Sequence, residues 1–491
     1  MVAAALGLDW LGQGLGAQGM PPNVVIIVAD DLGYGDVGVY GGRDIPTPNI
    51  DALARGGIRF TDGYVSSPIC SPTRAALMTG RYPQRFGLEF NLGKDAEDGL
   101  PLTEITIADR LKAAGYHTGL FGKWHLGAGP GFHPMDRGFD EFFGFLGGEH
   151  SYIDTNRKGV DPILDGRKPS GATPYLTDAL ADHAIEFIEQ PRSRPFFLYL
   201  AFNAVHRPMQ ATDKYLDRFQ DINDPRRRTY AAMLSAMDDA IGRTIATLRA
   251  QNLEENTLII FFADNGGPTM VGREVNYSSN GPLRGSKRQT YEGGIRVPFI
   301  IRWKGHLPEG TTDSRPIIEL DVMPTVLAAA GVPVQTRWKL DGVNLLPYLA
   351  GPKTSPPHEA LFWRLGANMA IRKGDWKLVK THEGSLRTVA GDWSDLSTAE
   401  LYNLRDDIGE KHNLAAAHLD KVNELASEWQ GWNDELAIPP VEPTLSYVMS
   451  GAGGRYFIGS SVIAGLLVLV LAVMRGLVGS ARSKELNEPT D

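Results

Sequence analysis

The sequence predicts an α/β protein built on a large mixed, mostly parallel sheet with helices on both of its faces. Short apolar runs rich in β-branched and aromatic residues indicate fully buried strands at 23–29, 195–202 and 257–263. Helical patterns of apolar residues lie between or beside them, at 103–114, 177–189 and 230–251. Strands that alternate with helices in this way are typical of a parallel sheet covered on both sides.

Polar side chains directly follow the predicted strands. They are Asp30 and Asp31, Lys123 and His125, His206, and Asp264 and Asn265. In a parallel sheet, ligands bind at the carboxyl ends of the strands, so we expect these side chains to gather at one edge. Adjacent carboxylates repel each other unless a cation lies between them, although a solvated turn is the simpler explanation of the Asp30–Asp31 pair alone.

The only cysteine of the chain, Cys70, opens the stretch Cys70-Ser71-Pro72-Thr73-Arg74. Ser71 is a candidate N-cap, Pro72 suits a first helical turn, and Gly80 is a candidate C-terminal stop. We therefore expect Cys70 just before a helix N-terminus, where an anion is favoured, with Arg74 reaching back toward it. The alternative is a buried free cysteine beside a surface helix. A single cysteine excludes an intramolecular disulfide.

The composition changes near residue 332, which predicts a boundary between a catalytic domain at 23–335 and a small α+β subdomain at 336–438. Before it, 285–294 is expected to be a loop, 297–302 a strand and 317–330 a helix. After it, apolar segments at 360–363 and 376–379 predict a small antiparallel sheet, with a helix at 418–432 packed on it.

The C-terminal segment 456–474 contains no charged residue and has about the length that a helix needs to cross a bilayer. We predict a transmembrane helix there, after a proline-containing linker at 439–455. More basic residues follow this segment than precede it, which predicts a cytoplasmic tail at 475–491 and a catalytic domain on the exoplasmic (periplasmic or extracellular) side. A buried core helix and a processed sorting signal are the alternatives.

Residues 1–22 resemble a truncated or atypical signal peptide, rich in Ala, Leu and Gly but without Lys or Arg. The formal net charge of −9 argues against a nucleic-acid partner. An anionic substrate would therefore need a local basic pocket.

The run Cys70-Ser71-Pro72-Thr73-Arg74 resembles the sulfatase signature Cys-x-Pro-x-Arg. Four further stretches resemble the arylsulfatase type of this family, within the alkaline phosphatase superfamily, and occur in the family's order. They are 29–36, 122–127, 263–266 and 291–294. The resemblance covers 23–332 and implies an enzyme that hydrolyses sulfate esters.

The resemblance also implies the site. A maturation enzyme would oxidise Cys70 to formylglycine, whose hydrate is the nucleophile. One divalent cation would be held by that residue together with Asp30, Asp31, Asp264 and Asn265. A set of oxygen ligands suits a hard ion, so Ca²⁺ is expected first and Mg²⁺ second.

In the mechanism that the family implies, one hydroxyl of the aldehyde hydrate attacks sulfur and displaces the alcohol. His206 and Lys287 would bind the sulfate and protonate the leaving oxygen, and His125 would take the proton of the second hydroxyl. Arg74 and Lys123 would hold the nucleophile. The expected substrate is a sulfated small molecule or glycan, and for an outward-facing enzyme we favour a glycan.

Two other functions fit the sequence less well. A phosphatase or phosphonate ester hydrolase on the same fold would share much of the site, and a membrane-anchored binding module would share only the fold. Activity on an aryl sulfate compared with an aryl phosphate separates these alternatives from a sulfatase.

Overall fold

The computed structural model describes residues 20–93, 98–156, 161–171, 173–270, 275–381 and 396–437. Its main feature is a ten-stranded sheet with the strand order β11-β2-β10-β9-β1-β8-β4-β5-β6-β7. The central strands β9, β1, β8, β4 and β5 are mutually parallel, whereas β10 is antiparallel to both of its neighbours. The predicted mixed, mostly parallel sheet is confirmed.

The strands of this sheet are β1 (Asn23–Ala29), β2 (Ile58–Phe60), β4 (His117–Lys123), β5 (Glu141–Phe145), β6 (Leu164–Asp165), β7 (Lys168–Pro169), β8 (Phe196–Ala201), β9 (Thr257–Ala263), β10 (Phe299–Arg302) and β11 (Thr311–Asp313). Every residue of β1, β8 and β9 is buried. This explains their unbroken apolar sequences, because strands covered on both faces need no polar side.

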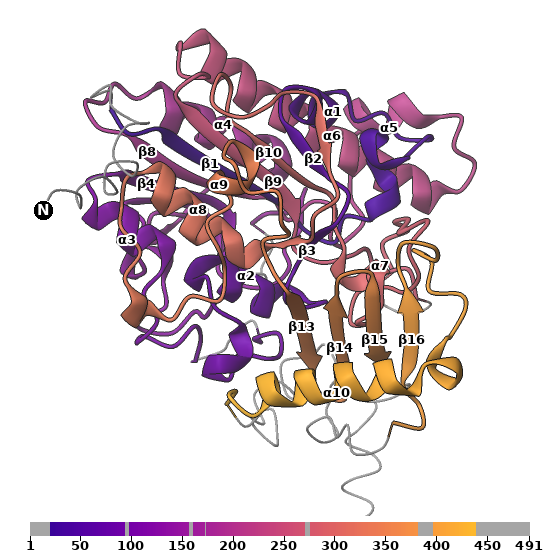
Figure 1. Ribbon diagram of the computed structural model, residues 1–491. Coiled ribbons are helices and arrows are strands. Elements are labelled where there is room, and N and C mark those ends of the chain that lie inside the picture. Colours follow the sequence, from indigo (N-terminus) through magenta and orange to yellow (C-terminus); the bar gives the residue numbers. More distant parts are fainter. Residues whose placement is uncertain are drawn as a thin grey trace, which may run out of the picture.

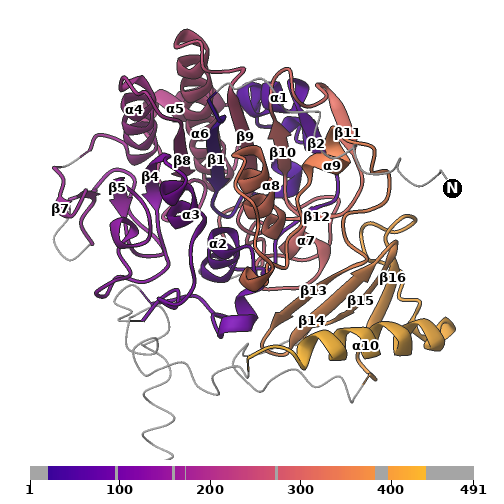
Figure 2. The same cartoon turned by 60° about the vertical axis from the view of Figure 1, so that its left-hand side comes forward.

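Helices cover both faces of the sheet, as predicted (Figures 1 and 2). One group packs together on one face: α1 (Pro48–Arg55), α4 (Leu176–Glu189), α5 (Asp213–Leu216) and α6 (Pro225–Ala250). A second group covers the other face: α2 (Cys70–Thr79), α3 (Ile107–Ala113), α8 (Val322–Ala329) and α9 (Leu346–Leu349). Both groups therefore protect the apolar strands from water.

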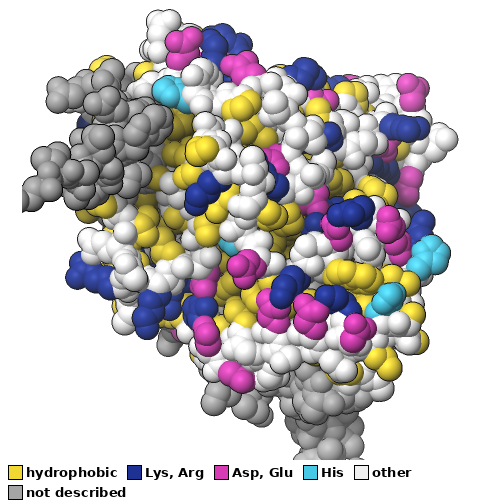
Figure 3. Space-filling model, in the orientation of Figure 1, with side chains coloured by type: hydrophobic (Ala, Val, Ile, Leu, Met, Phe, Trp, Pro, Cys, Tyr) yellow, Lys and Arg dark blue, Asp and Glu magenta, His cyan; other side chains and the backbone are white. Residues whose placement is uncertain are grey.

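The C-terminal part forms a second, four-stranded antiparallel sheet with one helix packed on it, as predicted. Its elements are β13 (Ala360–Leu365), β14 (Asn368–Lys373), β15 (Trp376–Lys380), β16 (Glu400–Asn403) and α10 (Leu419–Asn433). Acidic and basic side chains are interspersed over this part on the face shown in Figure 3. The short helix α7 (Glu292–Ile295) lies between this sheet and the larger one (Figure 1). The domain boundary near 335 stays a prediction.

The segment 317–330 differs from the single helix that we expected. It begins as strand β12 (Ile317–Ile318), which pairs with β3 (Gly63–Tyr64), continues as a 3-10 turn, and becomes helical only in α8. Both isoleucines are buried in this pairing. They fit a helical pattern of apolar residues, but as β-branched residues they also suit the strand that they form here.

The membrane placement is corrected. Among the described residues, no helix is both long enough and apolar enough to cross a bilayer. The segment 456–474 on which the single-pass prediction rested lies outside the described residues, as do the signal-like residues 1–19, the linker and the tail.

Candidate active site

The carboxyl ends of the central strands bring the predicted side chains together. β1 and β9 are paired in register, with Ala29 opposite Ala263, so Asp30 and Asp264 follow at neighbouring positions. Lys123 is the last residue of β4. His206 follows β8, where its imidazole lies 3.6 Å from Asp31 Oδ2. These residues therefore lie together at one edge of the sheet, as expected.

Cys70 is the first residue of α2, with Ile69 as the N-cap, and not the residue before the helix. Ser71 does not cap the helix because it is its second residue, and its hydroxyl accepts a hydrogen bond from the backbone N–H of Leu92, 3.2 Å away. Gly80 ends the helix as expected, at φ +66°. The Cys70 thiol is buried and lies 3.5 Å from Asp30 Oδ1.

Three carboxylates and the thiol form a compact group that can hold a metal ion. Each of Asp30, Asp31, Asp264 and Cys70 offers one ligand atom, and these four atoms lie within 4.8 Å of one another, all buried. Asn265 joins them through its amide N–H, which donates to Asp31 Oδ1 at 2.7 Å. Its amide oxygen is buried without a hydrogen-bond partner among the described residues. An unpaired buried acceptor beside three carboxylates is suited to a cation.

Three basic side chains balance these carboxylates. Lys123 Nζ lies 2.6 Å from Asp30 Oδ2, and Lys287 Nζ lies 2.7 Å from Asp31 Oδ1. The guanidinium of Arg74 donates through Nε and Nη2 to Asp264 Oδ2, at 3.0 and 2.8 Å. All six side chains are buried, so the charges interact at close range with little screening by water. A divalent cation and an anionic ester bring opposite charges and can both enter this balanced site.

Burial and these charges shift the pKa values of the site. Burial would raise the pKa of Asp31, but the nearby charges of Lys287 and His206 outweigh it and hold the pKa below its ordinary value. Burial raises the pKa of Asp264, and the neighbouring carboxylate of Asp30 adds to this. Burial also raises the pKa of the Cys70 thiol, again with a contribution from Asp264. The thiol is therefore held in its neutral form.

The two histidines lie on loops that follow β4 and β8. Burial lowers the pKa of His206 to about 4, with a further contribution from Lys287. Burial and the charge of Lys123 lower the pKa of His125 well below its ordinary value. His125 Nε2 is 3.1 Å from the carbonyl of Leu92, while its Nδ1 has no hydrogen-bond partner among the described residues. Gly148 packs against this ring, since a Cβ there would lie 2.5 Å from Nε2.

Two further residues support the site and were not predicted. The hydroxyl of Tyr199 lies 3.4 Å from Arg74 Nη1. Asn276 donates to the carbonyls of Asp31 and Val205 at 3.0 and 3.1 Å, which fixes the unusual backbone of Asp31 at φ +61°. The tyrosine lies in an apolar strand and the asparagine in a loop, so neither carries a signal in the sequence.

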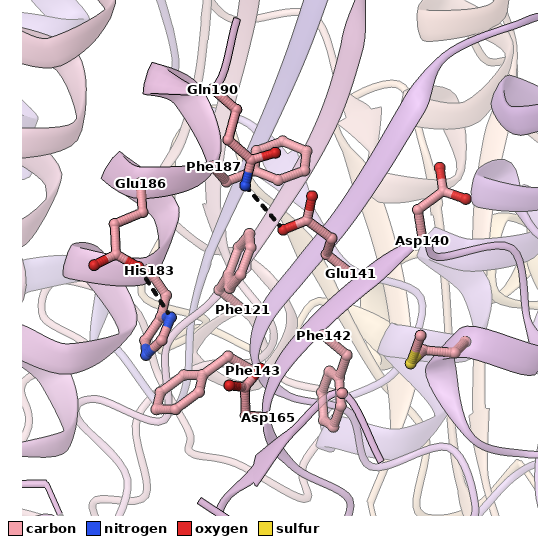
Figure 4. Close-up of a pocket in the computed structure, with 12 residues that line it drawn as sticks. Phe121, Asp140, Glu141, Phe142, Phe143, Asp165, His183, Glu186, Phe187 and Gln190 are labelled. Carbon is pink, nitrogen blue, oxygen red and sulfur yellow. Dashed lines mark hydrogen bonds and ion pairs between the residues drawn. The ribbon is translucent and has the colours of Figure 1, made fainter. Parts of the chain in front are cut away.

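A pocket elsewhere in the protein contains none of these residues. Figure 4 shows it between α4 and the strands β4 and β5, with the ring of His183 stacked 3.7 Å from that of Phe143. Three of the acidic side chains that line it are paired with neighbours: Asp140 with Lys112, Glu141 with His117, and Glu186 with His183. This pocket is therefore separate from the buried group around Cys70.

Comparison with known proteins finds several similar proteins. The family described as Sulfatase matches residues 22–332, and the N-sulphoglucosamine sulphohydrolase, C-terminal family matches 285–430. Arylsulfatase A of Homo sapiens is 37% identical over 442 residues, which cover 82% of this chain and 85% of that protein. N-acetylgalactosamine-6-sulfatase of Sus scrofa is 35% identical over 408 residues, covering 77% and 76% of the two chains.

A solved structure is also similar over most of its length. It is described as Ps i-CgsB in complex with k-i-k-neocarrahexaose, is 36% identical and has a TM-score of 0.79. The match covers 89% of this chain and 98% of that one.

Proposed function

Because this chain belongs to the sulfatase family and is a sulfuric ester hydrolase, we propose that it removes sulfate from saccharides with a formylglycine made from Cys70. One divalent cation would assist the reaction, bound by residue 70 with Asp30, Asp31, Asp264 and Asn265. The observation that carries the proposal is the buried Cys70 thiol inside the group of three carboxylates, balanced by Arg74, Lys123 and Lys287.

The state of the thiol supports its conversion to another group. A cysteine that acts directly as a nucleophile needs a lowered pKa, whereas burial and the adjacent carboxylates raise the pKa of Cys70. The thiol is therefore suited to be a precursor, and a formylglycine-generating enzyme is the expected partner. In the mature enzyme, the oxygens of the aldehyde hydrate would take the place that Sγ occupies here.

The donor set supports a hard cation. Carboxylate and amide oxygens without a histidine are ligands that suit Ca²⁺ first and Mg²⁺ second. When bound, the cation would polarise the sulfate oxygens and lower the pKa of the hydroxyl beside it.

The remaining side chains take roles that follow from their positions. Lys123 and Arg74 lie against Asp30 and Asp264, so they fix these carboxylates and bring positive charge to the nucleophile. His206 and Lys287 lie together at Asp31, where both can bind the sulfate and the ammonium group of Lys287 can supply a proton to the leaving oxygen. His125 has one ring nitrogen without a hydrogen-bond partner among the described residues, and its lowered pKa keeps the ring unprotonated, so this nitrogen can accept a proton.

A saccharide is the substrate class that the relatives favour. N-acetylgalactosamine-6-sulfatase carries an amino sugar in its name, and the similar solved structure holds a neocarrahexaose. Arylsulfatase A is about as similar to this chain as N-acetylgalactosamine-6-sulfatase is, so an aryl sulfate is also a useful test compound.

The test uses protein produced together with a formylglycine-generating enzyme, with the aldehyde at residue 70 confirmed by peptide mass. Sulfate release is then measured from an aryl sulfate and from a panel of defined sulfated saccharides, with an aryl phosphate for comparison. We expect calcium-dependent sulfate release and little phosphate release. A protein that carries the aldehyde and binds calcium but releases no sulfate from any ester would refute the proposal.

A further inference from the structure

The short helix α7 is hydrogen-bonded to three of the segments that supply the candidate site. Gly294 O accepts a hydrogen bond from Gly266 N at 3.1 Å, directly after Asn265. Gly293 N donates to Arg284 O at 2.6 Å, in the loop that carries Lys287. Ile295 O accepts from Val65 N at 2.9 Å, in the segment that leads to Cys70.

The backbones at these contacts lie so close together that there is no room for a side chain at Gly266 or Gly294. A Cβ on Gly266 would lie 1.8 Å from Gly293 O, and one on Gly294 would lie 2.0 Å from Gln289 O. A shift of α7 would therefore push directly on the loop of Asp264 and Asn265 and on the loop of Lys287. The position of α7 sets the geometry of both loops.

The buried side chain of Glu292 holds α7 in place, and one of its two basic partners, Lys377, comes from the four-stranded sheet. Glu292 is fully buried and accepts hydrogen bonds from Lys377 Nζ at 2.8 Å and from Tyr64 OH at 2.6 Å. Arg296 lies 2.9 Å from the same carboxylate. Lys377, on β15, also lies 2.9 Å from Glu410, whose carboxylate accepts from Glu292 N at 2.7 Å. We call these five residues the Glu292 cluster.

We propose that Glu292 is a positioning residue for the cation site, and that Lys377 of the C-terminal sheet acts through it. A buried carboxylate held by a buried lysine resists displacement, since separating the two leaves uncompensated charge in the interior. The C-terminal subdomain would thus be required for cation binding without contributing a ligand. This inference rests on the proposed function, because it takes the group around Cys70 as the cation site.

The experiment compares calcium binding and catalysis in Glu292→Gln and Lys377→Met with the wild-type protein. Calcium affinity is measured by titration calorimetry on the unmatured Cys70 form, which needs no turnover. Loss of partners outside the ligand shell weakens metal binding by about 10- to 100-fold, and we expect a loss of that size here. In the matured protein, kcat should fall at low calcium and recover as calcium is raised, with KM at saturating calcium unchanged.

The matched control is an exposed pair of the same subdomain. Lys373 Nζ lies 2.7 Å from Glu428 Oε2 between β14 and α10, and both side chains are partly exposed. Lys373→Met and Glu428→Gln should keep wild-type calcium affinity. Tyr64→Phe is the milder variant, since it keeps every charge and removes one hydroxyl from Glu292; we expect its calcium affinity to fall by about threefold, the equivalent of a weak hydrogen bond.

The outcomes separate the two proposals. A wild-type protein that binds no calcium and releases no sulfate would end the proposed function. A wild-type protein that does both, with folded Glu292→Gln or Lys377→Met variants of unchanged calcium affinity, would overturn only the positioning role. Where neither single variant folds, unchanged calcium affinity in Tyr64→Phe overturns it in the same way.

Discussion

Replacing Glu319 by glutamine should stabilise the protein at alkaline pH. Glu319 is fully buried in the 3-10 turn before α8, and its carboxyl group is bonded to the backbone N–H and the hydroxyl of Ser66. No salt bridge to it occurs within the described residues. Burial raises its pKa from the ordinary 4.5 to about 8. The native protein therefore holds this proton up to a pH at which the unfolded chain has lost it.

The sign and size of the effect follow from linkage. Below pH 4.5 both states are protonated, and above pH 8 both are ionised. Between these values the unfolded state binds fewer protons, so the free energy of unfolding falls by about 1.4 kcal/mol per pH unit as pH rises. Over this window the loss attributable to Glu319 reaches about 5 kcal/mol at most. Glutamine has a donor and an acceptor as the protonated carboxyl does, and it does not titrate.

The assay is urea unfolding of the wild type and Glu319→Gln at pH 5, 6, 7 and 8. We expect similar stability at pH 5 and a growing advantage of the glutamine variant above it. Glu89→Gln is the control, because Glu89 is equally buried but paired with Arg364 at 2.9 Å. Breaking such a pair should destabilise the protein by about 3–5 kcal/mol at pH 8. Parallel stability curves for Glu319→Gln and wild type would show that Glu319 is ionised in the native state.

Three further substitutions test the site. Asp264→Asn should weaken calcium binding by more than about a hundredfold, which is more than the loss of a contact outside the ligand shell causes. Titration calorimetry on the Cys70 form measures this affinity, and an unchanged value would show that Asp264 is not a ligand. Arg74→Met leaves Asp264 buried without its guanidinium, so the calcium-free protein should lose about 3–5 kcal/mol of unfolding free energy in urea, and a loss below about 1 kcal/mol would contradict this reasoning. Gly266→Ala forces a methyl group against Gly293 O and should cost about 1–3 kcal/mol, together with weaker calcium binding. A variant as stable as wild type would mean that α7 moves freely.

The sequence predicted the central strands closely because their burial is complete. The run 257–263 coincides with β9 and 23–29 with β1, since charged or turn-forming residues bound each apolar run. Helix α6 was predicted from residue 230 but begins at Pro225, because its first turn is polar and exposed. The residues at this helix start are nevertheless typical of a capped N-terminus. Asp224 accepts a hydrogen bond from Arg226 N, and Pro225 occupies the first helical position.

The gathering of Asp30, Lys123, His206 and Asp264 could be predicted because these residues end or follow strands of the central parallel sheet. The places of Cys70, Arg74 and Lys287 rested instead on the family resemblance.

The Glu292 cluster could not be predicted, because Tyr64, Lys377 and Glu410 are far from Glu292 in the chain and lie on three different segments. Glu292 and Lys377 are separated by 85 residues, and Glu292 and Glu410 by 118. Neither periodicity nor local spacing reports such pairs, and a buried lysine in a short strand looks like an ordinary edge residue.

Ala29 of β1 is paired with Ala263 of β9, so the relative direction of the carboxylates that follow depends on the number of residues in each strand. Successive side chains of a strand point to opposite faces, so one residue inserted into either β1 or β9 would turn its terminal carboxylate away from the other. Two inserted residues would restore the direction but carry that carboxylate about 7 Å further along the strand. Substitutions in these strands can therefore be tolerated where insertions and deletions cannot, and homologues that keep the activity should differ here in residue type but not in length.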